Sequence, residues 1–183
     1  MARLTHNEIQ KALRRMGELA LSQNTSVELI VVGGAAMVLV YNARESTQDV
    51  DSYIVHPKVA RLARAIAASV AKELDLAEDW LNDGAKGYLR GYSDGGVVFE
   101  APGITVRCPS PSQLLAMKLS AWRDDVDIAD ARMLLQVLMR SDVNHDNVWV
   151  AVEPYLIPGD EFRANASPNL RFTACFARQR PER

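Results

Sequence analysis

Residues 28–55 constrain the fold more than any other stretch of this chain. An apolar run, Leu29 to Val32, is short and rich in valine and isoleucine, which is typical of a buried strand. The run stops at Gly33-Gly34, where the backbone can turn sharply and approach another group without a Cβ in the way. The apolar residues 35–41 that follow have the length and composition of a short buried helix. The stretch therefore predicts a strand, a glycine turn and a helix in that order.

An acidic tripeptide, Asp49-Val50-Asp51, opens the next predicted strand. Side chains alternate along a strand, so the two carboxylates face the same way with their Cα atoms about 7 Å apart. Carboxylates held so close repel each other unless a cation lies between them, and Mg²⁺ carrying a nucleoside triphosphate suits that position. The helix that begins at Gly33 directs its first N–H groups over the turn, as is common where phosphate is bound. Each half of the pattern also occurs in ordinary turns and strand ends, and only the ordered combination predicts a site.

The pairing of Gly33-Gly34 with Asp49 and Asp51 resembles the signature of the nucleotidyltransferase superfamily, which has the DNA polymerase beta-like fold. Around it, the block Arg44-x-x-Thr47-x-Asp49-Val50-Asp51 is similar to that of small bacterial members from toxin-antitoxin and abortive-infection loci. The resemblance implies that the two aspartates bind Mg²⁺, and that the two glycines and Thr47 bind the nucleoside triphosphate. A segment between this block and the next strands, Trp80-Leu81-Asn82-Asp83, also resembles a motif of the bacterial family.

A second signature of the same bacterial family is similar to LLAMKLSAWRDDVDIADARMLL, residues 114–135. Here a helix carries Lys118, and Asp127-Ile128-x-Asp130 opens the next helix. The resemblance implies that Lys118 contacts the triphosphate and that Asp127 helps to hold the site together. An ammonium near phosphate oxygens neutralises charge during transfer, and an acid at a helix N-terminus can tether the lysine. The alternative is a lysine that extends along the surface to solvent.

Three structural and functional consequences follow from that second signature. Lys118 should point into the same cleft as Asp49 and Asp51, and Asp127 should lie within hydrogen-bond reach of Lys118 or of a nearby water. Replacing Lys118 with methionine should reduce transfer about 10²-fold or more while barely changing stability.

A third carboxylate is expected from the resemblance, because many nucleotidyltransferases use one, aligned with the Asp pair, to deprotonate the attacking hydroxyl. Residues 97–100 and 104–107 predict two strands joined by the turn Ala101-Pro102-Gly103. Glu100 is the acid that these strands offer. A glutamate in water on an edge strand is the alternative interpretation.

Capping signals and apolar spacing predict the other elements. Helices are expected at residues 5–22, 57–76, 110–122, 127–140 and 146–155, and from residue 167 onward. Residues 78–96 have no convincing period and contain the turn Asn82-Asp83-Gly84, so a long irregular loop is expected there. The arginine-rich end, with Arg163, Arg171, Arg178, Arg180 and Arg183, predicts either a basic tail or a guide for an acidic partner such as RNA.

Composition sets the outer bounds of the fold. With 183 residues, 48% of them hydrophobic and 24% charged, the chain is expected to be one α/β (α+β) domain with a helical appendage. Residues 1–109 would form a small mixed-sheet nucleotidyltransferase core with helices on its face, and residues 110–183 a helical C-terminal part packed on that core. The net charge of −2 gives no sign of the basic surface that strong, non-specific nucleic-acid binding usually requires, although RNA is not excluded. Cys108 and Cys175 predict neither a disulfide framework nor a zinc site, and the chain is expected to be cytoplasmic, neither secreted nor membrane-embedded.

The predicted reaction is a Mg²⁺-dependent transfer of a nucleoside monophosphate from a nucleoside triphosphate to a hydroxyl, with release of pyrophosphate. The resemblance implies an acceptor on RNA, such as the 3′ end of tRNA, or on protein, and a toxin-type role with a cognate antitoxin as partner. One alternative is a non-catalytic module that keeps the fold and acts as a binding or antitoxin-like partner. Another is a purely structural domain in which the motif match is chance.

Overall fold

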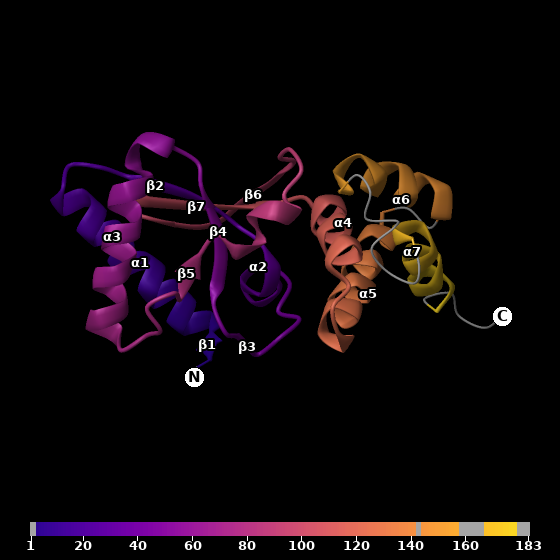
Figure 1. The fold of residues 1–183 in the computed structure, drawn as a ribbon, viewed down its shortest axis with the longest axis horizontal. Coiled ribbons are helices and arrows are strands. Elements are labelled where there is room, and N and C mark those ends of the chain that lie inside the picture. The colour runs from indigo at the N-terminus through magenta and orange to yellow at the C-terminus, as the bar shows by residue number, and fades with distance from the viewer. Residues whose placement is uncertain (1–2, 142–143, 158–166, 179–183) are drawn as a thin grey trace. The chain divides into compact units, whose positions relative to one another are not determined.

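The structure is a computed structural model that describes residues 3–141, 144–157 and 167–178. Its elements are labelled in Figure 1. The chain divides into two compact units. The first comprises Met1–Lys86 and Asp94–Pro109, and the second comprises Gly87–Ser93 and Ser110–Arg183.

The first unit is built on a mixed five-stranded sheet with the strand order β5-β4-β2-β7-β6. Strand β2 lies at its centre, antiparallel to β4 and parallel to β7, while β4 is parallel to β5 and β6 is antiparallel to β7. The strands are β2 (Val27–Val31), β4 (Val50–Ile54), β5 (Leu81–Asn82), β6 (Asp94–Ala101) and β7 (Ile104–Pro109). This sheet confirms the predicted α/β (α+β) class.

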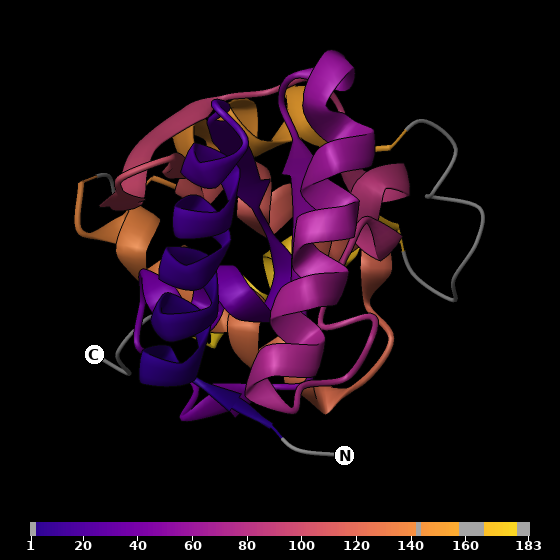
Figure 2. The same cartoon turned by 90° about the vertical axis from the view of Figure 1, so that its left-hand side faces the viewer.

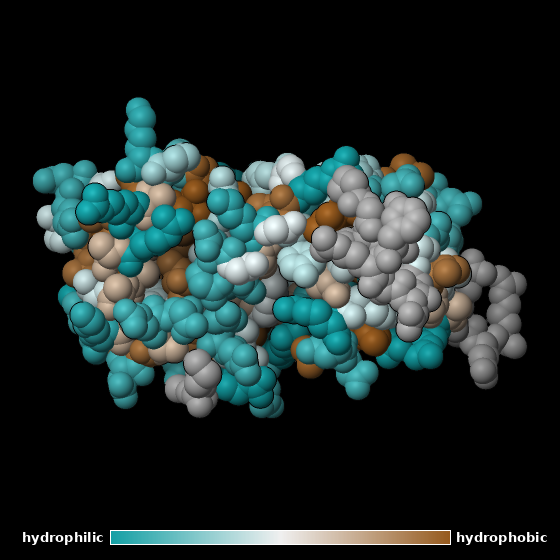
Figure 3. Space-filling model, in the orientation of Figure 1, coloured by the Kyte–Doolittle hydropathy of each residue, from teal (hydrophilic) through white to brown (hydrophobic). Residues whose placement is uncertain are grey.

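Two long helices, α1 (His6–Ser22) and α3 (Ala60–Leu74), lie side by side over one face of the sheet (Figure 2). The predicted capping box starts α1, because the Thr5 hydroxyl accepts from the Glu8 N–H and the Glu8 carboxylate accepts from the Thr5 N–H. The apolar stripes of both helices are buried, while hydrophilic side chains predominate on the face of the first unit shown in Figure 3. Full burial of a leucine or isoleucine stabilises the fold by about 1.5–3 kcal/mol, so these stripes supply much of the core.

The predicted irregular loop at residues 78–96 is partly ordered, which corrects that expectation. Strand β5 pairs with β4 through Val50↔Leu81 and Asp51↔Asn82, a 3₁₀ helix η2 follows at Gly84–Tyr88, and β6 begins at Asp94. The Trp80 side chain is buried and its indole N–H donates to the backbone carbonyl of a residue in α3. These contacts are tertiary, and a two-residue strand has no period that a sequence could display.

Strands β1 (Leu4–Thr5) and β3 (Ser46–Thr47) form a separate antiparallel pair in the first unit. Sequence patterns did not predict it, because each strand has only two residues. The pair ties the segment before Asp49 to the start of α1. It therefore fixes Thr47 close to the acidic strand.

The second unit is helical, as predicted. Its elements are α4 (Pro111–Ala121), α5 (Asp125–Met139), α6 (His145–Val152), the 3₁₀ helix η3 (Glu153–Tyr155) and α7 (Pro168–Ala177). Of the predicted basic tail, Arg171 is buried and donates to the carbonyl of Leu119, and Arg178 is exposed. Arg163, Arg180 and Arg183 lie outside the described residues. None of the helices in the described part of the chain has both the length and the apolar character needed to cross a bilayer.

Candidate active site

The acidic pair lies at the start of β4. Asp49 directly precedes the strand, Asp51 belongs to it, and Val50 between them is fully buried in the core. The Asp49 carboxylate accepts from the Asn82 side-chain amide at 2.8 Å, and Asp51 accepts from the Ala85 N–H at 3.2 Å. Both carboxylates are therefore held against the segment that runs from β5 into η2.

The glycine turn meets the acidic pair in space. Helix α2 (Gly33–Leu39) begins directly after β2, and Gly33 has a φ of +60°, a conformation that favours glycine. A Cβ on Gly33 would lie 2.7 Å from Oδ2 of Asp51, and a Cβ on Gly34 would collide with the Thr47 hydroxyl. Arg44 is also close, since its Nη1 is 3.4 Å from the same Gly34 position. Both glycines are thus required by the close approach of the block that carries the aspartates.

These contacts unite most of the site residues that the sequence predicts in the first unit. Gly33 faces Asp51, and Gly34 faces Thr47. The contact between Asn82 and Asp49 was not predicted, because the sequence pattern places Asn82 in a turn. The resemblance of the Trp80–Asp83 segment to a family motif was the signal that could have identified it.

Glu100 does not align with the acidic pair. The candidate third acid of the sequence is therefore not placed to act with Asp49 and Asp51. It pairs with Thr105, which pairs with Glu28, and the Glu28 carbonyl accepts from the N–H of Val55. Glu100 is therefore level with Val55, which follows Asp51 by four residues. Its distance from Asp51 is three strands, or about 14 Å, across the sheet and about 13 Å along it. This glutamate is exposed on β6, which is an edge strand. The alternative, an edge-strand glutamate in water, agrees with this placement.

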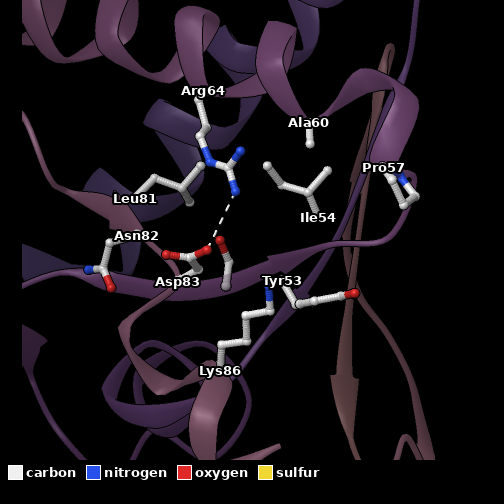
Figure 4. A pocket seen from close by; sticks show the side chains of 10 residues that line it. Tyr53, Ile54, Pro57, Ala60, Arg64, Leu81, Asn82, Asp83 and Lys86 are labelled. Carbon is white, nitrogen blue, oxygen red and sulfur yellow. Dashed lines mark hydrogen bonds and ion pairs between the residues drawn. The ribbon is translucent and has the colours of Figure 1, made fainter.

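A pocket of about 430 Å³ (Figure 4) includes in its lining Ser52, which follows Asp51 in β4, and Asn82, which donates to Asp49. Its lining combines apolar, aromatic and charged side chains: Ser52, Tyr53, Ile54, Pro57, Ala60, Arg64, Leu81, Asn82, Asp83 and Lys86. Arg64 lies 3.4 Å from the Asp83 carboxylate, and the Lys86 ammonium lies 5.7 Å from the centre of the Tyr53 ring. The volume falls within the range of small-molecule sites. Asn82 lines this pocket and also donates to Asp49 of the acidic pair.

The lysine of the second signature belongs to the second unit. The Lys118 ammonium lies 2.8 Å from a carboxylate oxygen of Asp127 and 2.8 Å from one of Asp130. The Lys118 side chain is 9% exposed and both aspartate side chains are 3% exposed. The expected contact between Lys118 and Asp127 is confirmed, and the alternative of a lysine extended to solvent is wrong. A cleft shared by Lys118 with Asp49 and Asp51 stays a prediction.

Charged neighbours control the ionisation of Asp127. Burial raises its pKa, but hydrogen bonds from Arg123 and Lys118 outweigh burial and hold the pKa at about 2. Asp124 caps α5 by accepting from the Asp127 N–H at 2.9 Å. The carboxylate is therefore ionised in the folded protein down to strongly acidic pH.

This lowered pKa predicts a pH-dependent stability. An unfolded aspartate titrates near pH 4, so the stabilisation by Asp127 is complete above that pH and is lost as the pH falls towards 2. The full loss of about 2 kcal/mol is reached below pH 2, and about half of it is expected by pH 3. Urea unfolding at pH 6, 4 and 3 measures it, and Asp127→Asn should flatten the pH dependence. Asp125→Asn, an exposed acid in the same helical turn, is the control. Equal slopes for Asp127→Asn and the parent would contradict the assignment.

The acidic pair suits Mg²⁺. This ion usually keeps several waters and is held by one or two carboxylates together with substrate phosphates. Asp49 and Asp51 would supply the carboxylates, and Oδ2 of Asp51 lies directly against Gly33 at the start of α2. Among the described residues, no group of three or more His, Cys, Asp or Glu side chains is arranged to hold a metal. Two carboxylates of this kind would hold Mg²⁺ only together with further oxygen ligands.

Comparison with known proteins identifies the family. No curated protein and no solved structure matches the chain. The model of one family, described as "Nucleotidyltransferase of unknown function (DUF6036)", matches residues 9–145. The match covers most of the chain, including the glycine turn, the acidic pair and the Lys118–Asp127 contact. The chain therefore belongs to this family of nucleotidyltransferases.

Proposed function

We propose that the protein transfers a nucleoside monophosphate from a nucleoside triphosphate to a hydroxyl in a Mg²⁺-dependent reaction. The observation that carries the proposal is the contact between the two halves of the signature. Gly33 lies against Asp51 and Gly34 against Thr47, so a phosphate-binding turn and a carboxylate pair meet in one place. Membership of the nucleotidyltransferase family supports the same reaction class.

Each residue has a proposed role in this reaction. Asp49 and Asp51 would hold Mg²⁺, which would neutralise charge on the phosphates. The backbone N–H groups of the glycine turn would face the triphosphate, and the Thr47 hydroxyl can donate to a phosphate oxygen. The acceptor oxygen attacks the α-phosphorus, the bond from that phosphorus to the bridging oxygen of the β-phosphate breaks, and pyrophosphate leaves. The proton of the acceptor hydroxyl passes to solvent.

Lys118 is the proposed contribution of the second unit. Its ammonium would balance the charge of the triphosphate, and Asp127 would support it through the contact at 2.8 Å. The paired carboxylates around Lys118 restrict its movement, which favours a fixed position over a flexible one. This role predicts that Lys118→Arg, which keeps the charge, preserves more activity than a neutral replacement.

The acceptor is proposed to be a hydroxyl of RNA, such as the 3′ end of tRNA, with a protein hydroxyl as the second possibility. The pocket beside the acidic pair supports RNA, because Arg64 and Lys86 in its lining suit a phosphate-bearing chain. A toxin-type role with a cognate antitoxin is proposed from the resemblance of the 44–51 block to small bacterial toxins. ATP is the first triphosphate to test.

Incubation with each of the four triphosphates tests the proposal. The reaction contains Mg²⁺ and either bulk RNA or RNA-depleted lysate, and released pyrophosphate is measured beside incorporation of an α-phosphate label. We expect pyrophosphate release that depends on both Mg²⁺ and an acceptor, with the label in one class of macromolecule. No release and no labelling with any triphosphate and either acceptor would contradict catalysis.

Triphosphate binding distinguishes the transferase from the main alternative, a non-catalytic module. A triphosphate that binds only the folded protein stabilises it by about 2.7 kcal/mol at a concentration of 100 Kd, so the melting temperature rises. A Mg²⁺-dependent rise without transfer would favour the binding module. The absence of any rise with all four triphosphates would count against the transferase and favour a non-catalytic, partner-binding or antitoxin-like module.

A further inference from the structure

Strand β5 brings the Asn82 side chain to the acidic pair. Neither the family match nor the motif resemblance gives Asn82 a role there. In the ladder between β4 and β5, Asn82 is the register partner of Asp51. Adjacent strands are about 4.8 Å apart, so Asn82 occupies the nearest position on a neighbouring strand. Its side-chain amide donates to Oδ2 of Asp49 at 2.8 Å. Asn82 therefore adjoins both aspartates, one through the backbone ladder and one through its side chain.

The orientation of the Asn82 amide is fixed at both ends. Its nitrogen donates to Asp49 and, at 3.3 Å, to the carbonyl of Asp79, and its oxygen accepts from the Gly84 N–H at 2.8 Å. The side chain is neutral, so it holds Asp49 without adding charge. A carboxylate in the same place would stand beside two others and could not donate to Asp49.

Two other acids, Glu100 and Asp83, do not take this position. Glu100 lies three strands away, as its register shows. Asp83 follows Asn82, but its carboxylate is turned towards Arg64 across the pocket, while Asn82 is turned away from that pair (Figure 4). Asn82 is thus the side chain that donates to Asp49 and belongs to the register partner of Asp51.

We propose that Asn82 is a positioning residue of the metal site: it orients Asp49 and keeps the site at two carboxylates. The inference rests on the proposed function for the role of the metal, but it concerns how the chain holds the ion. With two carboxylates and a neutral neighbour, the site binds Mg²⁺ weakly alone and tightly together with a triphosphate. This dependence makes the nucleotide a condition for metal binding.

Asn82→Asp tests the inference by adding the third carboxylate. Without nucleotide, calorimetry should show Mg²⁺ binding about tenfold tighter than in the parent, because ligand charge increases. In EDTA the variant should melt at a lower temperature than the parent, since three carboxylates repel one another, and Mg²⁺ should raise its melting temperature by more. Asn24→Asp makes the same change at an exposed position and controls for net charge. Asp83→Asn controls for the pocket's ion pair, and both controls should bind Mg²⁺ as the parent does.

A second variant keeps the inference testable if Asn82→Asp does not fold. Asn82→Ala removes the donor to Asp49, and we expect about tenfold weaker Mg²⁺ binding in the presence of a non-hydrolysable triphosphate. A folded Asn82→Asp with the Mg²⁺ affinity and melting temperatures of the parent would overturn the inference. So would an Asn82→Ala variant with unchanged binding.

The transfer assay separates this inference from the proposed function. If the parent transfers no nucleotide but Asn82→Asp gains Mg²⁺ affinity, the proposed function fails and the positioning role stands. If the parent transfers nucleotide and both Asn82 variants bind Mg²⁺ unchanged, the positioning role alone fails.

Discussion

Asp51→Asn should abolish nucleotidyl transfer, with a loss of at least about 10³-fold, while the protein stays folded. The change removes one of the two carboxylates that hold the metal and keeps the shape of the side chain. It also keeps an acceptor for the Ala85 N–H, so stability should fall by no more than about 1 kcal/mol. Incorporation of an α-phosphate label and urea unfolding measure the two effects. Asp49→Asn should behave in the same way.

Glu100→Gln is the matched control for this experiment. It removes an acid from the same sheet, but at the position that the register places far from the pair. Its transfer rate should equal that of the parent. Full activity in Asp51→Asn, or a loss in Glu100→Gln as large as that in Asp51→Asn, would contradict the assignment of the site.

Lys118→Met should lower the free energy of unfolding by about 3–5 kcal/mol, because it removes the ammonium that two buried carboxylates share. This expectation replaces the sequence-based one of a nearly unchanged stability. Lys118 is buried between Asp127 and Asp130, and Arg123 also pairs with Asp127. Urea unfolding measures the effect, and Lys72→Met, at an exposed lysine of α3, should change stability by less than about 0.5 kcal/mol.

Two further variants separate stability from activity at this position. Replacing Lys118, Asp127 and Asp130 together with apolar residues should recover part of the lost stability, since the ammonium and the two carboxylates that it pairs with are removed together. Lys118→Arg keeps the charge and tests contact with the triphosphate through its KM. A cost below about 1 kcal/mol for Lys118→Met would show that the two aspartates do not depend on this ammonium.

Strong local signals explain how much of the fold the sequence predicts. The Thr5–Glu8 capping box, the Gly33-Gly34 turn after an apolar strand, and the capped start of α4 at Ser110 each depend on residues a few positions apart. Such patterns have a direct physical cause in backbone conformation and hydrogen bonding, so they are visible without a structure. The structure confirms all three.

Features that depend on register were not predictable from the sequence. Asn82 meets Asp49 only because a two-residue strand pairs with β4, and Glu100 is separated from the pair only by the order of the strands. Asp130 joins Lys118 through the packing of α5 on α4. In each case the sequence displays the residue, but a non-local contact decides its neighbours.

The position of an isotope in the triphosphate gives the sharpest test of nucleotidyl transfer by the acidic pair. Parent protein, Mg²⁺, acceptor and one triphosphate are incubated with the label in either the α- or the γ-phosphate. The proposed reaction predicts that the α-label enters the acceptor, that the γ-label leaves as pyrophosphate, and that Asp51→Asn abolishes both. Entry of the γ-label into the acceptor, or α-label transfer that persists in Asp51→Asn, would contradict it.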